Sequence, residues 1–367
     1  MRELIEILAR PDLLNLAPYS SARSLNTQGS VFLDANEAPV APALFSSSTP
    51  FLNRYPEPQP VLLLERFSKL YQVPSSKLLI GRGSDEAIDL LVRGFCRAGI
   101  DKILTCPPTY GMYEMSAKIQ GAQTVHVPLI STSEDELLLD EVGIAQAIKR
   151  EKNLKLIFIC SPNNPTGTPF STETITRICK LASRTSFVVV DEAYLEFQTS
   201  DSILASLKSL PNLVVLRTLS KAWALAGVRC GVAIADEAVI ELLQKIRPPY
   251  PLSTPAIQAI LDGTSSIQQE RLTKRVQSIR TERDSLIARL KKLETVEKIF
   301  PSSTNFILVK FKNSGRIFSN LRAKGIILRD RSTELGLENC IRITVGTEEE
   351  NTTLLQALGE ALEEACS

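Results

Sequence analysis

The chain has 367 residues, enough for about two domains. Hydrophobic residues make up 44% and charged residues 23%, as is typical of a globular protein with a sizeable core. Lys and Arg total 42 against 41 Asp and Glu, so the net charge of +1 provides no basic surface to attract nucleic acid or an anionic membrane.

The first 60 residues have an irregular pattern. Eight prolines interrupt them, which leaves room for one short amphipathic helix and a strand near residues 31–33. Three acidic residues accompany the apolar ones at the N-terminus, and no apolar run approaches the ~20 residues that a membrane span requires. We therefore expect a cytoplasmic protein with no membrane partner.

Helical and strand-like segments alternate from residue 61 onward. Helical spacing predicts helices after Thr109 and at 61–71, 84–97, 141–152 and 172–183. Apolar runs predict strands at 77–80, 102–106, 122–127, 154–160, 187–190 and 213–216. This alternation predicts an α/β domain around a mostly parallel sheet that is buried on both faces.

The pattern changes after the proline-rich stretch 248–251. A long polar helix is expected over 268–292, followed by short segments at 306–311, 317–324, 326–328 and 340–345 and a final helix from about 348. These segments predict a smaller α+β domain. We divide the chain into an N-terminal segment that joins the smaller domain (1–45), a large domain (46–265) and the small C-terminal domain (266–367).

The residue types exclude several chemistries. His126 is the single histidine, so a metal site with several histidine ligands cannot form, and a Ser-His-Asp triad would depend on this one residue. The seven cysteines include no Cys-x-x-Cys pair, which is typical of reduced, buried thiols. We expect an enzyme without a metal.

Four loops after predicted strands carry polar side chains, at the place where ligands of open α/β sheets bind. Residues 81–86 (GRGSDE) open a helix whose free amides favour a phosphate, although Ser84 as an N-cap explains this pattern equally well. Residues 161–167 (SPNNPTG) fit a rigid turn that orients an amide, and an ordinary loop fits the same composition.

The other two loops carry charged groups. Asp191 directly follows an apolar strand, where a carboxylate needs a cation or a metal unless it caps the next helix. Lys221 lies between hydroxyl-bearing residues and small or apolar ones. Desolvation there would lower the pKa of the amine and favour its nucleophilic form, whereas a solvated loop lysine is the alternative.

The order of four polar residues along the chain resembles that in the fold-type-I pyridoxal-phosphate enzymes, in particular the class II aminotransferases: Asn164, Asp191, Tyr194 and Lys221. The resemblance extends over nearly the whole chain: LDANEAP (33–39), RYPEP (54–58), GSDEAIDLL (83–91), PPTYGMY (107–113), SPNNPTG (161–167), DEAY (191–194), RTLSKAWALAGVRCG (217–231), STNFILV (303–309) and IRITVGT (341–347). Within the class, segments 33–39 and 54–58 are most similar to the histidinol-phosphate branch.

The resemblance implies a fold-type-I large domain and pyridoxal 5′-phosphate as cofactor. Lys221 would bond to the cofactor's aldehyde and later move the substrate proton. Asp191 would pair with the protonated ring nitrogen. Asn164 and Tyr194 would bond the ring's 3′-oxygen, and Tyr110 would stack on the ring.

The resemblance also implies how two phosphates would be bound. The cofactor's phosphate would be held by the backbone amides of Ser84 and Asp85, the hydroxyls of Thr218 and Ser220, and Arg229. Tyr55 is similar to a tyrosine that family members lend to the neighbouring subunit, which implies a homodimer. A substrate phosphate would be bound by Arg342 and Arg329, with Arg331 able to exchange roles with Arg329 and with Tyr19 and Asn36 as further candidates.

The implied reaction is transamination of histidinol phosphate, a phosphorylated amino alcohol, with 2-oxoglutarate, which gives imidazole acetol phosphate and glutamate in histidine biosynthesis. An aromatic-amino-acid aminotransferase and a threonine-phosphate decarboxylase share the same core and remain alternatives. A non-catalytic transcriptional sensor would need a DNA-binding domain, for which there is no room before residue 30.

Overall fold

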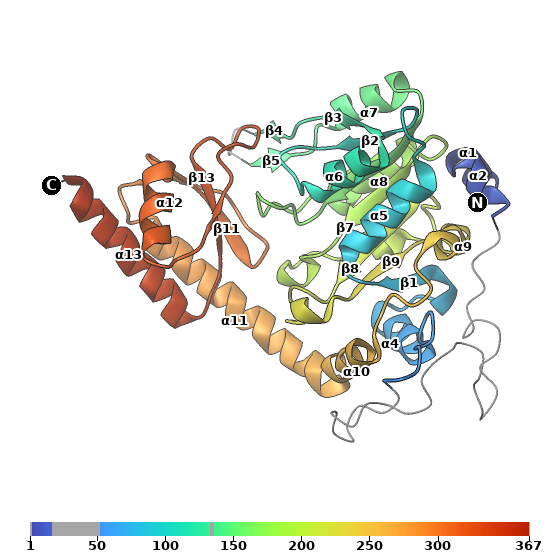
Figure 1. The fold of residues 1–367 in the computed structure, drawn as a ribbon. Helices are drawn as coiled ribbons and strands as arrows, with labels where there is room; N and C mark the ends of the chain where they lie inside the picture. Colours follow the sequence, from blue (N-terminus) through green and yellow to red (C-terminus); the bar gives the residue numbers. More distant parts are fainter. Residues whose placement is uncertain (1, 17–51, 133–135, 367) are drawn as a thin grey trace.

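The computed structural model describes residues 2–16, 52–132 and 136–366, with side chains described up to residue 360. A seven-stranded sheet in the order β1-β9-β8-β7-β6-β2-β3 forms the middle layer of the larger part of the molecule (Figure 1). The strands are β1 (Leu78–Gly81), β2 (Lys102–Thr105), β3 (Gln123–His126), β6 (Leu154–Cys160), β7 (Phe187–Asp191), β8 (Leu213–Thr218) and β9 (Gly231–Ile234). All neighbours pair in parallel except β9, which is antiparallel to β8 and β1, so the predicted mostly parallel sheet is confirmed.

Helices cover both faces of this sheet. On β7, Val188 and Val190 point into one core, and Phe187 and Val189 point into the other. The first core is closed by α4 (Val61–Tyr71), α7 (Glu141–Arg150), α8 (Thr172–Leu181) and α10 (Thr254–Gly263). The second is closed by α1 (Arg2–Leu8), α2 (Pro11–Leu14), α5 (Ser84–Phe95), α6 (Met112–Gln120) and α9 (Glu237–Ile246). Because both faces are buried, the strands are apolar throughout and do not alternate with polar residues.

A smaller unit follows along the helix α11 (Ser266–Leu290), which leads away from the large sheet (Figure 1). Its four-stranded antiparallel sheet has the order β10-β11-β13-β12. The elements are β10 (Val296–Ile299), β11 (Phe306–Phe311), α12 (Ser314–Ala323), β12 (Arg329–Asp330), β13 (Cys340–Thr344) and α13 (Glu348–Cys366). Leu290, Ile307 and Ile343 belong to a core of this unit that is separate from the two cores of the large sheet.

The N-terminal helices pack on the large sheet's side of the molecule. Ile5, Leu8 and Leu13 join the core under α5 and α9, because this core offers an apolar surface to the apolar faces of α1 and α2. The expectation that residues 1–45 join the smaller domain therefore does not hold for residues 2–16. Residues 17–45, including the expected strand at 31–33, lie outside the described residues.

Some elements differ from the sequence predictions. The short apolar segment expected at 326–328 has no regular structure. It follows Gly325, which has a φ of 79°, and the strand β12 begins only at Arg329. The short strands β9 and β10, the hairpin of β4 (Ile130–Ser131) and β5 (Leu137–Leu138), and the helices α9 and α10 were not predicted. Among the described residues, no helix combines the length and the apolarity that crossing a bilayer requires.

Candidate active site

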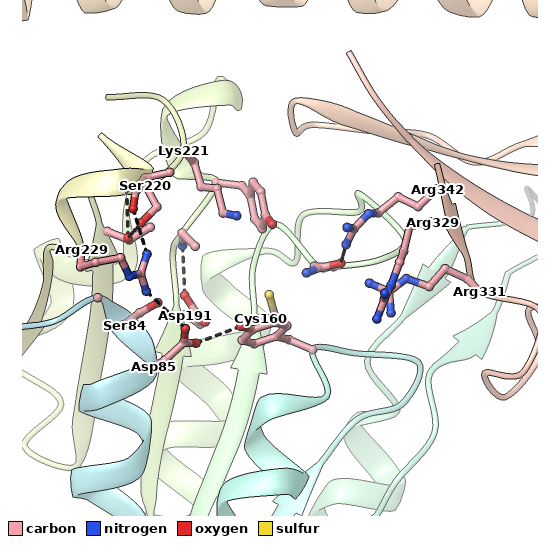
Figure 2. A pocket seen from close by; sticks show the side chains of 17 residues that line it. Ser84, Asp85, Cys160, Asp191, Ser220, Lys221, Arg229, Arg329, Arg331 and Arg342 are labelled. Atoms are coloured by element: carbon pink, nitrogen blue, oxygen red, sulfur yellow. Dashed lines mark hydrogen bonds and ion pairs between the residues drawn. The ribbon is translucent and has the colours of Figure 1, made fainter. Parts of the chain in front are cut away.

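A cavity of about 440 Å³ lies where β6, β7 and β8 end, within the ~300–1,000 Å³ typical of small-molecule sites. Its lining includes most of the side chains selected from the sequence (Figure 2): Ser84, Asp85, Tyr110, Asn164, Asp191, Tyr194, Thr218, Ser220, Lys221, Arg229, Arg329, Arg331 and Arg342. They gather because parallel strands present their carboxyl ends at one edge of the sheet.

Asp191 is the last residue of β7 and only 2% exposed. Tyr113 Oη donates a hydrogen bond to its Oδ2 at 2.9 Å, and the backbone N–H of Ala193 donates to its Oδ1 at 3.1 Å. Burial raises the pKa of Asp191 to about 6, against the opposing effect of these two bonds. The side chain is therefore mostly a carboxylate at neutral pH.

Lys221 extends into the open cavity, where its amine remains accessible to solvent. The surrounding protein nevertheless lowers its pKa by desolvation, and the positive charge of Arg342 lowers it further. Its Nζ lies 5.5 Å from the centre of the Tyr194 ring. Burial raises the pKa of Tyr194, so this residue keeps its hydroxyl proton at neutral pH.

A cradle with the chemistry to hold an anion lies at the start of α5. The helix begins at Ser84, and its N-cap residue Gly83 has a φ of 90° and no capping side chain, so the first backbone amides of the helix are free for a ligand. This excludes the alternative in which Ser84 is only an N-cap. A Cβ atom at Gly83 would lie 2.9 Å from Arg229 Nη2, which shows how closely this guanidinium covers the cradle.

The other wall of the cradle comes from the segment between β8 and β9. Thr218 Oγ1 and Ser220 Oγ lie 3.0 Å apart, and both residues line the cavity. A Cβ atom at Gly231 would come within 2.3 Å of the carbonyl carbon of Gly83, so only glycine allows β9 to approach the start of α5 this closely.

Asn163, which was not selected from the sequence, connects the two loops that present Tyr110 and Asn164. Its Nδ2 donates to the Pro108 carbonyl at 2.9 Å, and its Oδ1 accepts a bond from Thr109 Oγ1 at 2.9 Å. The hydroxyl of Tyr110 in turn donates to the Asp85 carboxylate at 2.9 Å.

Three arginines form a second cationic centre on the side of the cavity opposite Arg229 (Figure 2). Strand pairing places Arg329 of β12 opposite Arg342 of β13, and Arg331 follows β12. Arg342 Nη1 donates to Asn164 Oδ1 at 2.6 Å, so the small unit's sheet is bonded to a loop of the large one. Burial lowers the pKa of Arg342, and the neighbouring Arg331 lowers it further.

Three of the selected residues are not in this cavity's described lining. Tyr55 is 51% exposed, and its ring stacks on Tyr250 with 4.5 Å between centroids. Tyr19 and Asn36 lie outside the described residues. Within the described ranges, no group of three or more His, Cys, Asp or Glu side chains is placed to hold a metal ion.

The fold and the cavity define an aminotransferase of the pyridoxal-phosphate-dependent kind, and the chain belongs to the family of class I and II aminotransferases, whose sequence model it matches over residues 28–358. The histidinol-phosphate aminotransferase of Shigella flexneri serotype 5b is 44% identical over 351 residues, which cover 96% of each chain. A structure of histidinol-phosphate aminotransferase from Sinorhizobium meliloti in complex with pyridoxal-5′-phosphate is 26% identical with a TM-score of 0.77, covering 85% of this chain and 84% of that one. The enzyme of the same name from Clostridium acetobutylicum, 24% identical with a TM-score of 0.75 over 85% of this chain and 92% of its own, shares the fold.

Pyridoxal 5′-phosphate is the cofactor of this family, and the cavity's own chemistry fits it. The cradle at the start of α5 offers amides, hydroxyls and Arg229 to a phosphate, and the absence of side chains at Gly83 and Gly231 leaves it open. Asp191 offers a buried carboxylate suited to a protonated ring nitrogen, and Lys221 offers an amine of lowered pKa to an aldehyde.

Proposed function

We propose that this enzyme transfers the amino group of histidinol phosphate to 2-oxoglutarate, giving imidazole acetol phosphate and glutamate, as a step of histidine biosynthesis. The observation that carries the proposal is the second cationic centre of Arg329, Arg331 and Arg342, which shares one cavity with the cradle at Arg229. A substrate with its own phosphate requires such a centre in addition to the one that holds the cofactor. The 44% identity to histidinol-phosphate aminotransferase over nearly the full length supports it.

The residues of the cradle hold the cofactor's phosphate in this proposal. Ser84 and Asp85 contribute backbone N–H groups. The side chain of Asp85 does not contribute, because its carboxylate would repel a phosphate. Thr218 and Ser220 contribute hydroxyls, and Arg229 contributes the cation that pairs with the dianion.

When bound, pyridoxal 5′-phosphate supplies a conjugated ring that accepts the electron pair left on the substrate carbon after its proton is removed. With the cofactor bound, the Nζ atom of Lys221 would accept that proton and give it back, which requires an amine that is neutral for part of the time. Asp191 holds the ring-nitrogen proton through its carboxylate. Asn164 and Tyr194 orient the ring through its 3′-oxygen, and Tyr110 covers one face.

Arg342 and Arg329 bind the substrate's phosphate in this proposal. Arg331 Nη1 pairs with Glu334 Oε1 at 2.5 Å, which partly neutralises its charge. This leaves Arg329 as the better partner of Arg342 for a phosphate.

We also propose a cytoplasmic homodimer in which Tyr55 reaches the partner's phosphate cradle. In the described structure Tyr55 is half exposed and does not line its own chain's cavity. The segment that follows Tyr55 is bonded to the strand β1. Gln59 Nε2 donates to the Ile80 carbonyl at 2.8 Å, and the Ile80 N–H donates to Gln59 Oε1 at 2.9 Å.

A single-turnover experiment tests the reaction. Holoenzyme mixed with histidinol phosphate alone should form one imidazole acetol phosphate per site, and 2-oxoglutarate added afterwards should restore the starting absorbance with release of glutamate. Phenylalanine should react far more slowly, and threonine phosphate should release no carbon dioxide. Equal rates for phenylalanine, or decarboxylation of threonine phosphate, would support one of the alternatives instead.

A further inference from the structure

The hydroxyl of Tyr113 contacts Asp191, and the mechanism above does not use it. Tyr113 lies in the first turn of α6 and is fully buried. Its Oη donates to Asp191 Oδ2 at 2.9 Å, so it reaches from a helix on one face of the sheet to the end of the strand β7.

Packing explains the ring of Tyr113 but not its hydroxyl. The ring stacks on Phe158 with 4.7 Å between centroids and an interplanar angle of 11°, and it meets Tyr110 edge-on at 5.5 Å. Phenylalanine would make both contacts without a polar atom. A buried hydroxyl is unfavourable unless it forms a hydrogen bond, so the bond to Asp191 is what the oxygen contributes at this position.

We propose that Tyr113 is a positioning residue whose hydroxyl holds the Asp191 carboxylate ionised and oriented for the ring nitrogen of the cofactor. The proposal rests on the role assigned to Asp191 under the proposed function. Tyr113 fixes Oδ2 and the Ala193 N–H fixes Oδ1, so two donors from different elements determine the plane of the carboxylate.

The charged and titratable groups around Asp191 show why this donor matters. Burial raises the pKa of Asp191, Asp85 raises it further, and Lys221 lowers it. Cys160, Tyr110 and Tyr194 also interact with Asp191 electrostatically. The bond from Tyr113 is the largest influence that opposes burial. The thiol of Cys160 donates to the Pro162 carbonyl at 3.4 Å and not to Asp191.

The test compares wild type with Tyr113→Phe, which keeps the ring and its stacking. Cofactor affinity is measured by fluorescence titration between pH 5 and 9, and the protonation of the ring nitrogen is followed by NMR of ¹⁵N-labelled cofactor in the holoenzyme. Binding requires the ionised carboxylate, so affinity falls as pH drops through the pKa of Asp191. Losing a donor to this charged group should move the midpoint of that fall upward by about one to two pH units. The ¹⁵N resonance should move toward that of a neutral pyridine.

Tyr71→Phe is the matched control, because it removes the same hydroxyl from a tyrosine that stacks on Phe67 outside the cavity's lining, and it should leave both readouts at wild-type values. An unchanged midpoint and ¹⁵N resonance in folded Tyr113→Phe would overturn the proposal.

If this variant does not fold, 3-fluorotyrosine at position 113 provides a stronger donor of nearly the same shape. It should move the midpoint downward, and no movement would overturn the proposal. Asp191→Asn distinguishes a failure of the Tyr113 proposal from a failure of the role proposed for Asp191, because wild-type behaviour of that variant would contradict the role of Asp191 itself.

Discussion

At the scale of single residues, burial acts on Lys221 and Asp191 in the same physical way and with opposite results. Removing water disfavours the charged form of each, so the pKa of the amine is lowered and that of the carboxyl is raised to about 6. Both shifts bring the pKa values of these groups closer to neutral pH. The free energy needed to move a proton to or from either group at neutral pH is therefore smaller.

Lys221 is expected to be the residue that reacts with the cofactor. Borohydride reduction of the holoenzyme should fix the cofactor on the peptide that contains Lys221, as mapped by mass spectrometry. Lys221→Arg should keep a cation at this position, bind the cofactor without the covalent bond and lose nearly all turnover. A label found on another lysine would contradict the assignment.

The buried carboxylate of Asp191 should lower the stability of the apoenzyme. Its pKa is raised from 3.8 to about 6 on folding, so the folded protein binds the proton more tightly than the unfolded chain between these values. Stability is therefore lost as pH rises from about 4 to 6, and Asp191→Asn should escape this loss. We expect the variant's advantage in free energy of unfolding to grow over this range by about 3 kcal/mol and then level off, as measured by urea denaturation. A constant difference at all pH values would contradict the raised pKa.

At the scale of elements, the cradle depends on how closely strand β9 approaches helix α5. Gly231→Ala would place a Cβ atom within 2.3 Å of the Gly83 carbonyl carbon, so the backbone must move apart. We expect cofactor affinity to fall at least about tenfold, which corresponds to about 1.4 kcal/mol. Gly227→Ala is the control, because its added Cβ would meet no atom within 4 Å beyond its own neighbours in the chain. Equal affinities of the two variants would show that the close approach is unimportant.

The pairing of β12 with β13 determines which arginines face the substrate. Arg329→Gln should raise the KM for histidinol phosphate about 10- to 100-fold, because a bond between charged groups is worth about 1.5–3 kcal/mol. A substrate without phosphate, such as phenylalanine, should be much less affected. Arg331→Gln should have the smaller effect, since Glu334 already pairs with Arg331. Steady-state kinetics measure both, and equal losses for both substrates would contradict phosphate recognition.

At the scale of the whole molecule, the proposed dimer predicts complementation between two defective variants. Tyr55→Phe and Lys221→Ala subunits are mixed and the mixed dimers are isolated. One site then contains Lys221 together with the intact Tyr55 of the other subunit, and its cofactor affinity should match wild type. The Tyr55→Phe homodimer should bind more weakly by about 1.5–3 kcal/mol. Verified mixed dimers without this rescue would place the effect of Tyr55 within its own chain.

The strands of the large sheet could be predicted because their apolar runs are local features of the sequence. The run at 154–160 and the helix at 61–71 have the predicted bounds. The strand β9 was missed because its four residues carry too little periodicity to separate a strand from other buried segments. Tyr113 and Asn163 were missed because their partners Asp191 and Pro108 lie 78 and 55 residues away. Such contacts become visible only when the sheet has brought the loops together.

The reversed direction of β9 has a consequence for how the site forms. Thr218 at the end of β8 pairs with Gly231 at the start of β9, so residues 218–231 form a loop whose two ends are fastened to each other. This one loop carries Lys221, Ser220 and Arg229. The nucleophile and the phosphate ligands of this loop, Ser220 and Arg229, therefore belong to one cooperative unit, and a local opening of this pairing would release them together, while the amides at the start of α5 would stay in place. A half-assembled site, with a bound phosphate and no lysine in place, is not a state that this topology favours.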